Sequence, residues 1–201
     1  MKKFQLPLLL LGWTLVIFFP GTHANAETVK ITTGEWKPFI SKVFKHGGII
    51  LHIVREAFAR KGIDVEIEFF PWARAVKYVA DGSWDAMAVT ASRFPTKGVQ
   101  YLYSDAVYIG EDVVFHLKDS PPRGNSFADM KGLNFGAVLS YNYTPEYRKA
   151  VEDGQISEVV APDAELLFPM LAAKRFDVFI MDKTAGVYTY NTTRIQLISA
   201  T

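Results

Sequence analysis

Two hydroxyl side chains and a guanidinium follow one short apolar stretch of the sequence. The run from Ala86 to Val89 is continuously apolar, which indicates a strand covered on both faces. Thr90, Ser92 and Arg93 come directly after it. Small molecules bind beyond the carboxyl ends of strands in open α/β sheets, and a guanidinium pairs in bidentate fashion with a carboxylate. The sequence therefore predicts a carboxylate site here, unless Arg93 is an ordinary solvated loop residue.

A second apolar stretch ends on a carboxylate. The segments 84–90 and 176–182 both follow a predicted helix, begin with an aromatic residue and an aspartate, and end on a polar residue. This likeness implies two similar lobes, with Arg93 at a strand end of one and Asp182 at a strand end of the other. Such a pair would clamp a zwitterion, because Arg93 would bind its carboxylate and Asp182 would accept hydrogen bonds from its ammonium group.

Two tryptophans are candidates for the walls of that site. Trp36 lies in the loop 34–39 after a predicted strand, where Pro38 excludes both a helix and a central strand. Trp72 follows Pro71, which suits the first turn of a helix at the same expected sheet edge. Both rings would stack on a ligand through aromatic packing or cation–π attraction. The alternative for the Trp36 loop is that it folds onto the core.

Strand-type and helix-type patterns alternate along the chain after residue 28, which predicts an α/β fold with mainly parallel sheets. The segment 118–126 is the most polar and turn-rich part and is the best candidate for a border between two lobes. The expected strands cover 29–33, 65–69, 86–89, 113–117, 133–139, 156–160 and 176–182, and the expected helices cover 49–61, 71–80, 126–129, 144–153 and 164–174.

The N-terminal segment 1–26 has the pattern of a secretory signal peptide. Two lysines precede an apolar run, and Ala24-Asn25-Ala26 offers a cleavage site after Ala26. Export to the bacterial periplasm follows, and the alternative is that the segment is kept as an anchor. The formal net charge of the chain is only +1, without a basic block, so we expect neither nucleic-acid nor membrane-surface binding.

Catalytic and metal-binding patterns are weak. The chain has no cysteine, which excludes a disulfide framework and thiolate chemistry. His46, His52 and His116 are scattered without the spacing of metal ligands. We therefore expect no cofactor and no metal.

In their order and spacing, these motifs resemble the bacterial extracellular solute-binding proteins of the polar amino-acid branch, which are the receptors of ABC importers. The resemblance runs from residue 29 to about 197, and it is carried by residues 36–39, 85–93, 103–108, 136–142 and 171–182. It implies a two-lobed periplasmic-binding-protein-like fold, an amino-acid-like ligand, an inner-membrane ABC permease as partner, and a monomer that is not an enzyme.

The resemblance also implies roles for single residues. It makes Arg93 the ligand of an α-carboxylate and Asp182 the ligand of an α-ammonium group, with Trp36 and Trp72 as the aromatic walls. From the second lobe, Tyr141 or Asn142 would reach the carboxylate. Lobe one would cover 27–117, with 113–117 as its hinge strand, and lobe two would cover 118–201.

Some features depart from the family pattern. Ala86 and Ala88 stand where amino-acid binders often carry hydroxyls, and the segment 71–75 is divergent. The strand that would return to complete lobe one is not found before Thr201, so we expect an incomplete lobe one and a truncated or fragmentary chain. Two alternatives stay open: an enzyme similar to periplasmic cyclohexadienyl dehydratases, with Glu35 as its acid-base group, and a sensor module.

Overall fold

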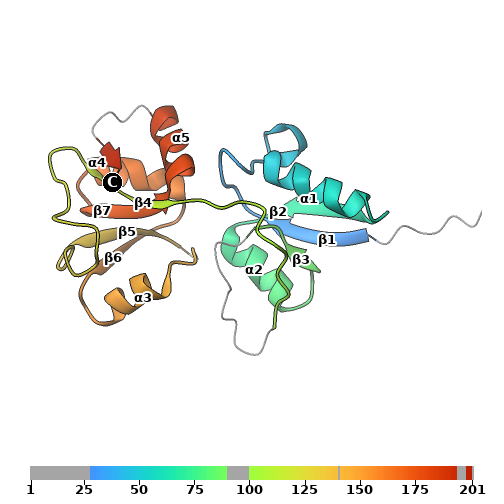
Figure 1. Ribbon diagram of the computed structural model, residues 1–201, viewed down its shortest axis with the longest axis horizontal. Coiled ribbons are helices and arrows are strands. Elements are labelled where there is room, and N and C mark those ends of the chain that lie inside the picture. The colour runs from blue at the N-terminus through green and yellow to red at the C-terminus, as the bar shows by residue number, and fades with distance from the viewer. Residues whose placement is uncertain (1–27, 90–99, 140, 194–197, 201) are drawn as a thin grey trace, which may run out of the picture.

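Two β-sheets, each packed with its own helices, form two bodies that lie side by side and are joined by an extended segment leading into β4 (Figure 1). The computed structural model describes residues 28–89, 100–139, 141–193 and 198–200. The first sheet has three strands in the order β2-β1-β3, and the second has five in the order β6-β5-β7-β4-β8. The α/β class with two mostly parallel sheets is confirmed.

The strands are β1 (Thr28–Thr33), β2 (Asp64–Phe69), β3 (Ala86–Met87), β4 (Asp112–Leu117), β5 (Asn134–Val138), β6 (Ser157–Ala161), β7 (Val178–Asp182) and β8 (Ile198–Ala200). The α-helices are α1 (Ile49–Ala59), α2 (Trp72–Ala80), α3 (Pro145–Glu152), α4 (Leu167–Ala172) and α5 (Lys183–Thr193). Two short 3₁₀ turns, Lys45–Gly47 and Ala164–Leu166, precede α1 and α4.

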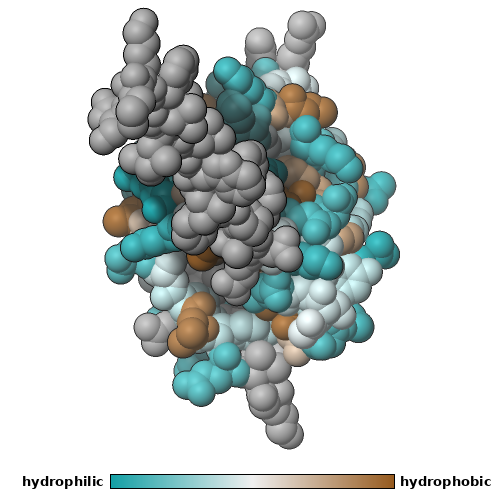
Figure 2. All heavy atoms as spheres, turned by 90° about the vertical axis from the view of Figure 1, so that its right-hand side faces the viewer, coloured by the Kyte–Doolittle hydropathy of each residue, from teal (hydrophilic) through white to brown (hydrophobic). Residues whose placement is uncertain are grey.

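The first body, lobe one, is a parallel sheet in which β1 lies between β2 and β3. Helix α1 buries Ile50 and Leu51, whereas Ile49 and Ile53 of the same predicted apolar face are 56% and 42% exposed. Viewed from the lobe-one end, the described surface carries its apolar groups as small separate spots among hydrophilic ones (Figure 2). Single exposed apolar side chains of this kind are normal on a protein surface.

Strand β3 is shorter than the sequence pattern suggests. The predicted strand 86–89 was wrong beyond Met87, because only Ala86 and Met87 pair with β1 as a ladder. Ala88 N–H still donates to Thr32 O at 2.8 Å, but Val89 has a φ of 75°, a left-handed conformation that no strand accommodates. The four apolar residues are therefore enough for a short strand, but the backbone turns away at Val89 and ends the strand early.

The second body, lobe two, is a mixed sheet covered on both faces. Strands β5, β6 and β7 are parallel, and β4 runs antiparallel to β7 and β8. On one face, Phe115, Phe168 and Phe179 pack with ring centroids 5.0–5.4 Å apart. On the other, Phe135 and Tyr147 of α3 pack at 5.8 Å. The strand expected at 113–117 is thus β4, a member of the lobe-two sheet.

Two helix expectations need correction. The short helix expected at 126–129 is wrong: Ser126 and Asp129 do exchange hydrogen bonds, with Ser126 Oγ donating to Asp129 Oδ2 at 2.6 Å, but they close a turn. Helix α5 was not expected, because its sequence lacks an apolar stripe. It begins after Asp182, whose Oδ1 accepts from Ala185 N–H at 2.9 Å, and its buried residues Ala185, Gly186 and Thr189 face the sheet. In the described part of the chain, the helices are all too short or too polar to span a bilayer.

Candidate functional site

The predicted site residues that the structure describes lie where strands of the two sheets end. In lobe one, β1 leads into the Trp36 loop and β2 into α2 with Trp72. In lobe two, β5 leads toward Tyr141, and β7 ends at Asp182. Because parallel strands end at one edge of their sheet, each lobe gathers its candidates at a single edge.

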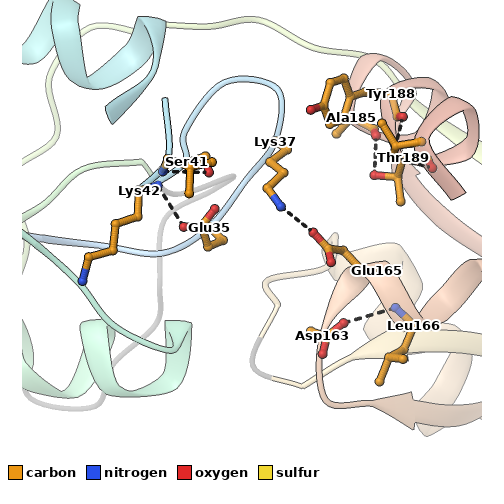
Figure 3. A network of polar contacts seen from close by, with 12 residues as sticks. Glu35, Lys37, Ser41, Lys42, Asp163, Glu165, Leu166, Ala185, Tyr188 and Thr189 are labelled. Atoms are coloured by element: carbon orange, nitrogen blue, oxygen red, sulfur yellow. Dashed lines mark hydrogen bonds and ion pairs between the residues drawn. The ribbon is translucent and has the colours of Figure 1, made fainter. Parts of the chain in front are cut away.

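Contacts between the two lobes show that these edges face each other. Lys37 Nζ lies 3.0 Å from Glu165 Oε1, and in Figure 3 the Lys37 side chain extends from the lobe-one loop toward Glu165 of lobe two. The side chains of Trp72 and Tyr141 also lie close to each other across the lobes. The region between the lobes is therefore bounded on one side by the Trp36 loop and α2, and on the other by the loops after β5 and β6.

The Trp36 loop is folded onto an aromatic cluster. The Trp36 ring centroid lies 4.7 Å from that of Phe39 and 5.6 Å from that of Tyr108, and Phe39 and Tyr108 are 4.4 Å apart. Trp36 N–H donates to Ile40 O at 2.9 Å, which closes the loop on itself. Trp36 is half-buried, so the ring packs inward and yet keeps an accessible face.

The Trp72 ring is positioned by close packing against the backbone of Gly34. Its Nε1–H donates to Glu35 O at 3.2 Å, and its ring lies against Gly34, where a Cβ would meet Trp72 Cε2 at 2.5 Å. Only glycine leaves room for the indole at this point. Burial raises the pKa of Tyr141, and the nearby Trp72 indole of lobe one opposes part of that rise. Tyr141 therefore stays a neutral phenol at physiological pH.

Asp182 is held in a fixed orientation at the end of β7. Its Oδ2 accepts from the Tyr108 hydroxyl at 3.0 Å, and its Oδ1 accepts from Ala185 N–H at 2.9 Å. Tyr108 thus connects the Trp36 cluster to this carboxylate. Asp112 stands opposite Asp182 in the β4–β7 register, and desolvation together with the charge of Asp182 raises the pKa of Asp112. Asp182 therefore presents an oriented negative charge at the edge of lobe two.

A cavity of about 330 Å³ lies between the Lys37 loop and α5, and residues of both lobes line it. Its lining consists of Lys37, Glu165, Tyr188, Thr189, Thr192 and Thr193. We did not predict the α5 residues from the sequence. The signal that was available is the i, i+3, i+4 spacing of the three threonines after Asp182, which places them on one helix face.

The structure brings Trp72 and Tyr141 into contact, and it links Trp36 to Asp182 through Tyr108. Asn142 follows Tyr141 at the same edge and is half-buried. Arg93 and Thr90, the predicted carboxylate ligands, lie outside the described residues. The predicted site residues that the structure describes are thus Trp36, Trp72, Tyr141, Asn142 and Asp182.

Glu35, the acid-base candidate of the enzyme alternative, is exposed, and its Oε1 accepts from Lys42 N–H at 2.9 Å. The rings of His46 and His52 stack with centroids 4.7 Å apart. Among the residues that the structure describes, no three histidine, aspartate or glutamate side chains form a group that could hold a metal ion.

Comparison with known proteins shows which solved structures share this arrangement of lobes. No family model and no curated protein sequence matches the chain. A structure on glutathione import through GshT and the cystine importer TcyBC of Streptococcus mutans matches with a TM-score of 0.72 and 19% identity over 88% of this chain and 76% of that one. An ancestral arginine-binding protein bound to arginine matches with a TM-score of 0.71 and 15% identity, over 86% and 77%.

A histidine kinase sensor domain, described as similar to periplasmic binding proteins, matches with a TM-score of 0.63 and 17% identity over 87% of this chain and 76% of that one. At identities this low, the structural matches show a shared fold and nothing more. The chain has the two-lobed α/β fold of the bacterial periplasmic proteins that bind polar amino acids.

Proposed function

We propose that this protein is a solute-binding receptor that captures a small zwitterionic, amino-acid-like ligand between its two lobes. The observation that carries the proposal is the facing of the two strand-end edges, joined by the Lys37–Glu165 ion pair at 3.0 Å and by the contact of Trp72 with Tyr141. A ligand placed there would touch both lobes at once, which is the requirement for a receptor that closes around its solute.

The ligand's charged groups would meet opposite charges on opposite lobes. Asp182 would accept from the ammonium group, because its carboxylate is already oriented by Tyr108 and by the start of α5. Arg93 would bind the carboxylate in bidentate fashion, with Thr90, Tyr141 and Asn142 as further polar contacts. The faces of Trp36 and Trp72 would cover the remaining part of the ligand.

The receptor would act in the periplasm as a monomer and deliver its ligand to an inner-membrane ABC permease. Support for this setting comes from the signal-peptide pattern of residues 1–26 and from the fold shared with proteins of import systems. The proposed lobe one covers 27–117, with 113–117 as the hinge strand, and the proposed lobe two covers 118–201. This hinge strand falls within β4, which pairs with β7 and β8, so it would link lobe one directly to the lobe-two sheet.

The proposal is tested by the thermal unfolding of the protein against a panel of amino acids and the corresponding compounds that lack either the amino or the carboxyl group. A ligand at about one hundred times its dissociation constant stabilises the folded state by about 2.7 kcal/mol. We expect a shift with at least one zwitterion, loss of that shift in Arg93→Ala, and an unchanged shift in the control Arg123→Ala. A panel without any shift would contradict the proposal.

A sensor module is the second candidate, since a histidine kinase sensor domain shares the fold. The two functions differ in the partner that responds to the ligand. A receptor loaded with its ligand would raise the ATPase activity of its reconstituted permease, whereas a sensor module would change the autophosphorylation of a kinase and leave the permease unaffected.

A further inference from the structure

A second cavity, of about 480 Å³, lies on lobe two between strand β6 and helix α4 and shares no lining residue with the cavity between the lobes. Six of its seven lining residues are apolar and the seventh is a cation: Val160, Pro162, Leu166, Pro169, Met170, Ala173 and Arg175. Val160 and Leu166 are 53% and 40% exposed, so this apolar groove is open to solvent. Covering it with the apolar side chains of another molecule would be favourable, because apolar surface would leave water.

Strand β6 has unpaired backbone groups beside the groove. It stands at the end of the lobe-two sheet and, among the described strands, pairs with β5 alone (Figure 1). Toward β5, Ser157 N–H donates to Leu133 O at 3.2 Å. Because successive residues of a strand point their backbone groups to alternate sides, the N–H and C=O groups of Glu158 and Val160 point away from β5. Such an edge can pair with an extended segment of another chain.

Arg175 is the charged member of the lining, and no described residue forms an ion pair with it. The carboxylates of the neighbouring segments each have a partner within the protein: Glu158 with Arg148, Asp163 with the Leu166 N–H, Glu165 with Lys37 and Asp177 with the Asn134 N–H. Charge complementarity therefore favours a carboxylate on the molecule that covers the groove.

A second copy of this chain fits the groove poorly. Its β6 would bring Glu158 as its one charged residue, and that carboxylate already binds Arg148 at 3.0 Å. We propose that the groove binds an extended apolar segment of a different protein, which adds a strand to β6 and places a carboxylate on Arg175. Its apolar side chains cover Val160 and Leu166, and its backbone pairs with the outward groups of β6. This interaction is separate from solute capture.

The test measures the binding of terminally blocked, fluorescein-labelled hexapeptides to the whole protein by fluorescence anisotropy. The parent peptide alternates valine and threonine and carries one glutamate near its C-terminus. A peptide with glutamine instead should bind at least about fivefold more weakly, since hydrogen bonds between charged groups are the stronger ones. Two further peptides carry N-methyl groups on alternate backbone nitrogens, one in each phase. Only the phase whose methyl groups face β6 should weaken binding, by at least about tenfold, because those nitrogens no longer donate.

Two variants test the protein side. Val160→Pro removes an outward N–H, which an edge strand tolerates, and should weaken the parent peptide at least about fivefold. The methylated peptides test the same contact without altering the protein. Arg175→Gln should abolish the preference for glutamate over glutamine. The matched control Lys174→Gln removes the neighbouring cation, which lies outside the lining, and should keep this preference.

Several outcomes would overturn the inference. They are no binding of the parent peptide, equal affinity for the glutamate and glutamine peptides, and equal effects of the two methylation phases. A concentration-dependent dimer in analytical ultracentrifugation that Val160→Pro abolishes would assign the groove to a second copy of this chain instead. Each of these outcomes leaves the proposed solute capture between the lobes untouched.

Discussion

At the scale of single residues, Asp182 combines a structural and a proposed ligand-binding role. It closes the first turn of α5 through Ala185 N–H and accepts from the Tyr108 hydroxyl. We expect Asp182→Asn to weaken ligands that carry an ammonium group by at least tenfold, because the charge that pairs with that group is lost. Titration calorimetry with an amino acid and its des-amino analogue measures the difference, and Asp119→Asn serves as an exposed control.

The Asp182→Asn variant has a second readout that does not depend on any ligand. The pKa of Asp112 is raised first by desolvation and then by the charge of Asp182. Removal of that like charge must lower the pKa of Asp112, since the charged form is then opposed by one interaction fewer. Carboxyl titration by NMR reports this pKa directly. An equal loss of affinity for ligands with and without an ammonium group would contradict the role assigned to Asp182.

At the scale of elements, the start of α2 is held against the Trp36 loop by one glycine. A side chain at Gly34 would collide with the Trp72 ring, whose Nε1–H donates to Glu35 O. We expect Gly34→Ala to lower the free energy of unfolding by about 1–3 kcal/mol, as overpacking does, and to weaken ligand binding by displacing Trp72. Urea unfolding and titration calorimetry measure the two effects.

Shortening the indole should relieve this collision. In the background of Trp72→Leu, the cost of Gly34→Ala for unfolding should therefore fall well below its value in the unaltered protein. A cost that is the same in both backgrounds would show that the collision with Trp72 is not its cause.

Helix α5 illustrates why an element can escape prediction. Its residues are mainly threonine, tyrosine and small side chains without an apolar stripe, a composition of modest helix propensity. The helix forms because Asp182 caps it and because Ala185 and Gly186 fit against β4, where a larger side chain at Gly186 would overlap the Phe115 ring. Its stability therefore comes from tertiary packing rather than from local preference.

At the scale of the whole molecule, the ion pair between the lobes is a contact of modest strength. The side chains of Lys37 and Glu165 are 32% and 64% exposed. Exposed ion pairs of this kind contribute about 0–1 kcal/mol. We expect Lys37→Met and Glu165→Gln each to change the free energy of unfolding by less than about 1 kcal/mol in the absence of ligand.

Denaturant titration of both variants checks this expectation. A loss of several kcal/mol would mean that the pair is part of the fold, and an altered affinity in these variants would then reflect a damaged protein. A small change would allow their ligand affinities to be interpreted as properties of the cavity.

Most elements could be predicted from the sequence, because their patterns are local. Strand β2 alternates between exposed and half-buried residues as its period of two requires, and α1 follows Gly48 as expected. The wrong predictions lie where contacts between distant residues or the backbone angles determine the local structure. Val89 turns out of its strand, and Ser126 with Asp129 closes a turn although their spacing suits a helix start.

The sequence by itself determined the α/β alternation, the strand ends that carry polar and aromatic residues, and the candidate residues Trp36, Trp72, Tyr141 and Asp182. Only the tertiary structure decided which of them meet. Tyr108 and Asp182 are 74 residues apart in the chain, and Lys37 and Glu165 are 128 apart. Side-chain periodicity reports the face on which a residue lies within its own element, whereas contacts at such separations depend on how complete lobes pack. For that reason the cavity beside α5 became visible only in the folded molecule.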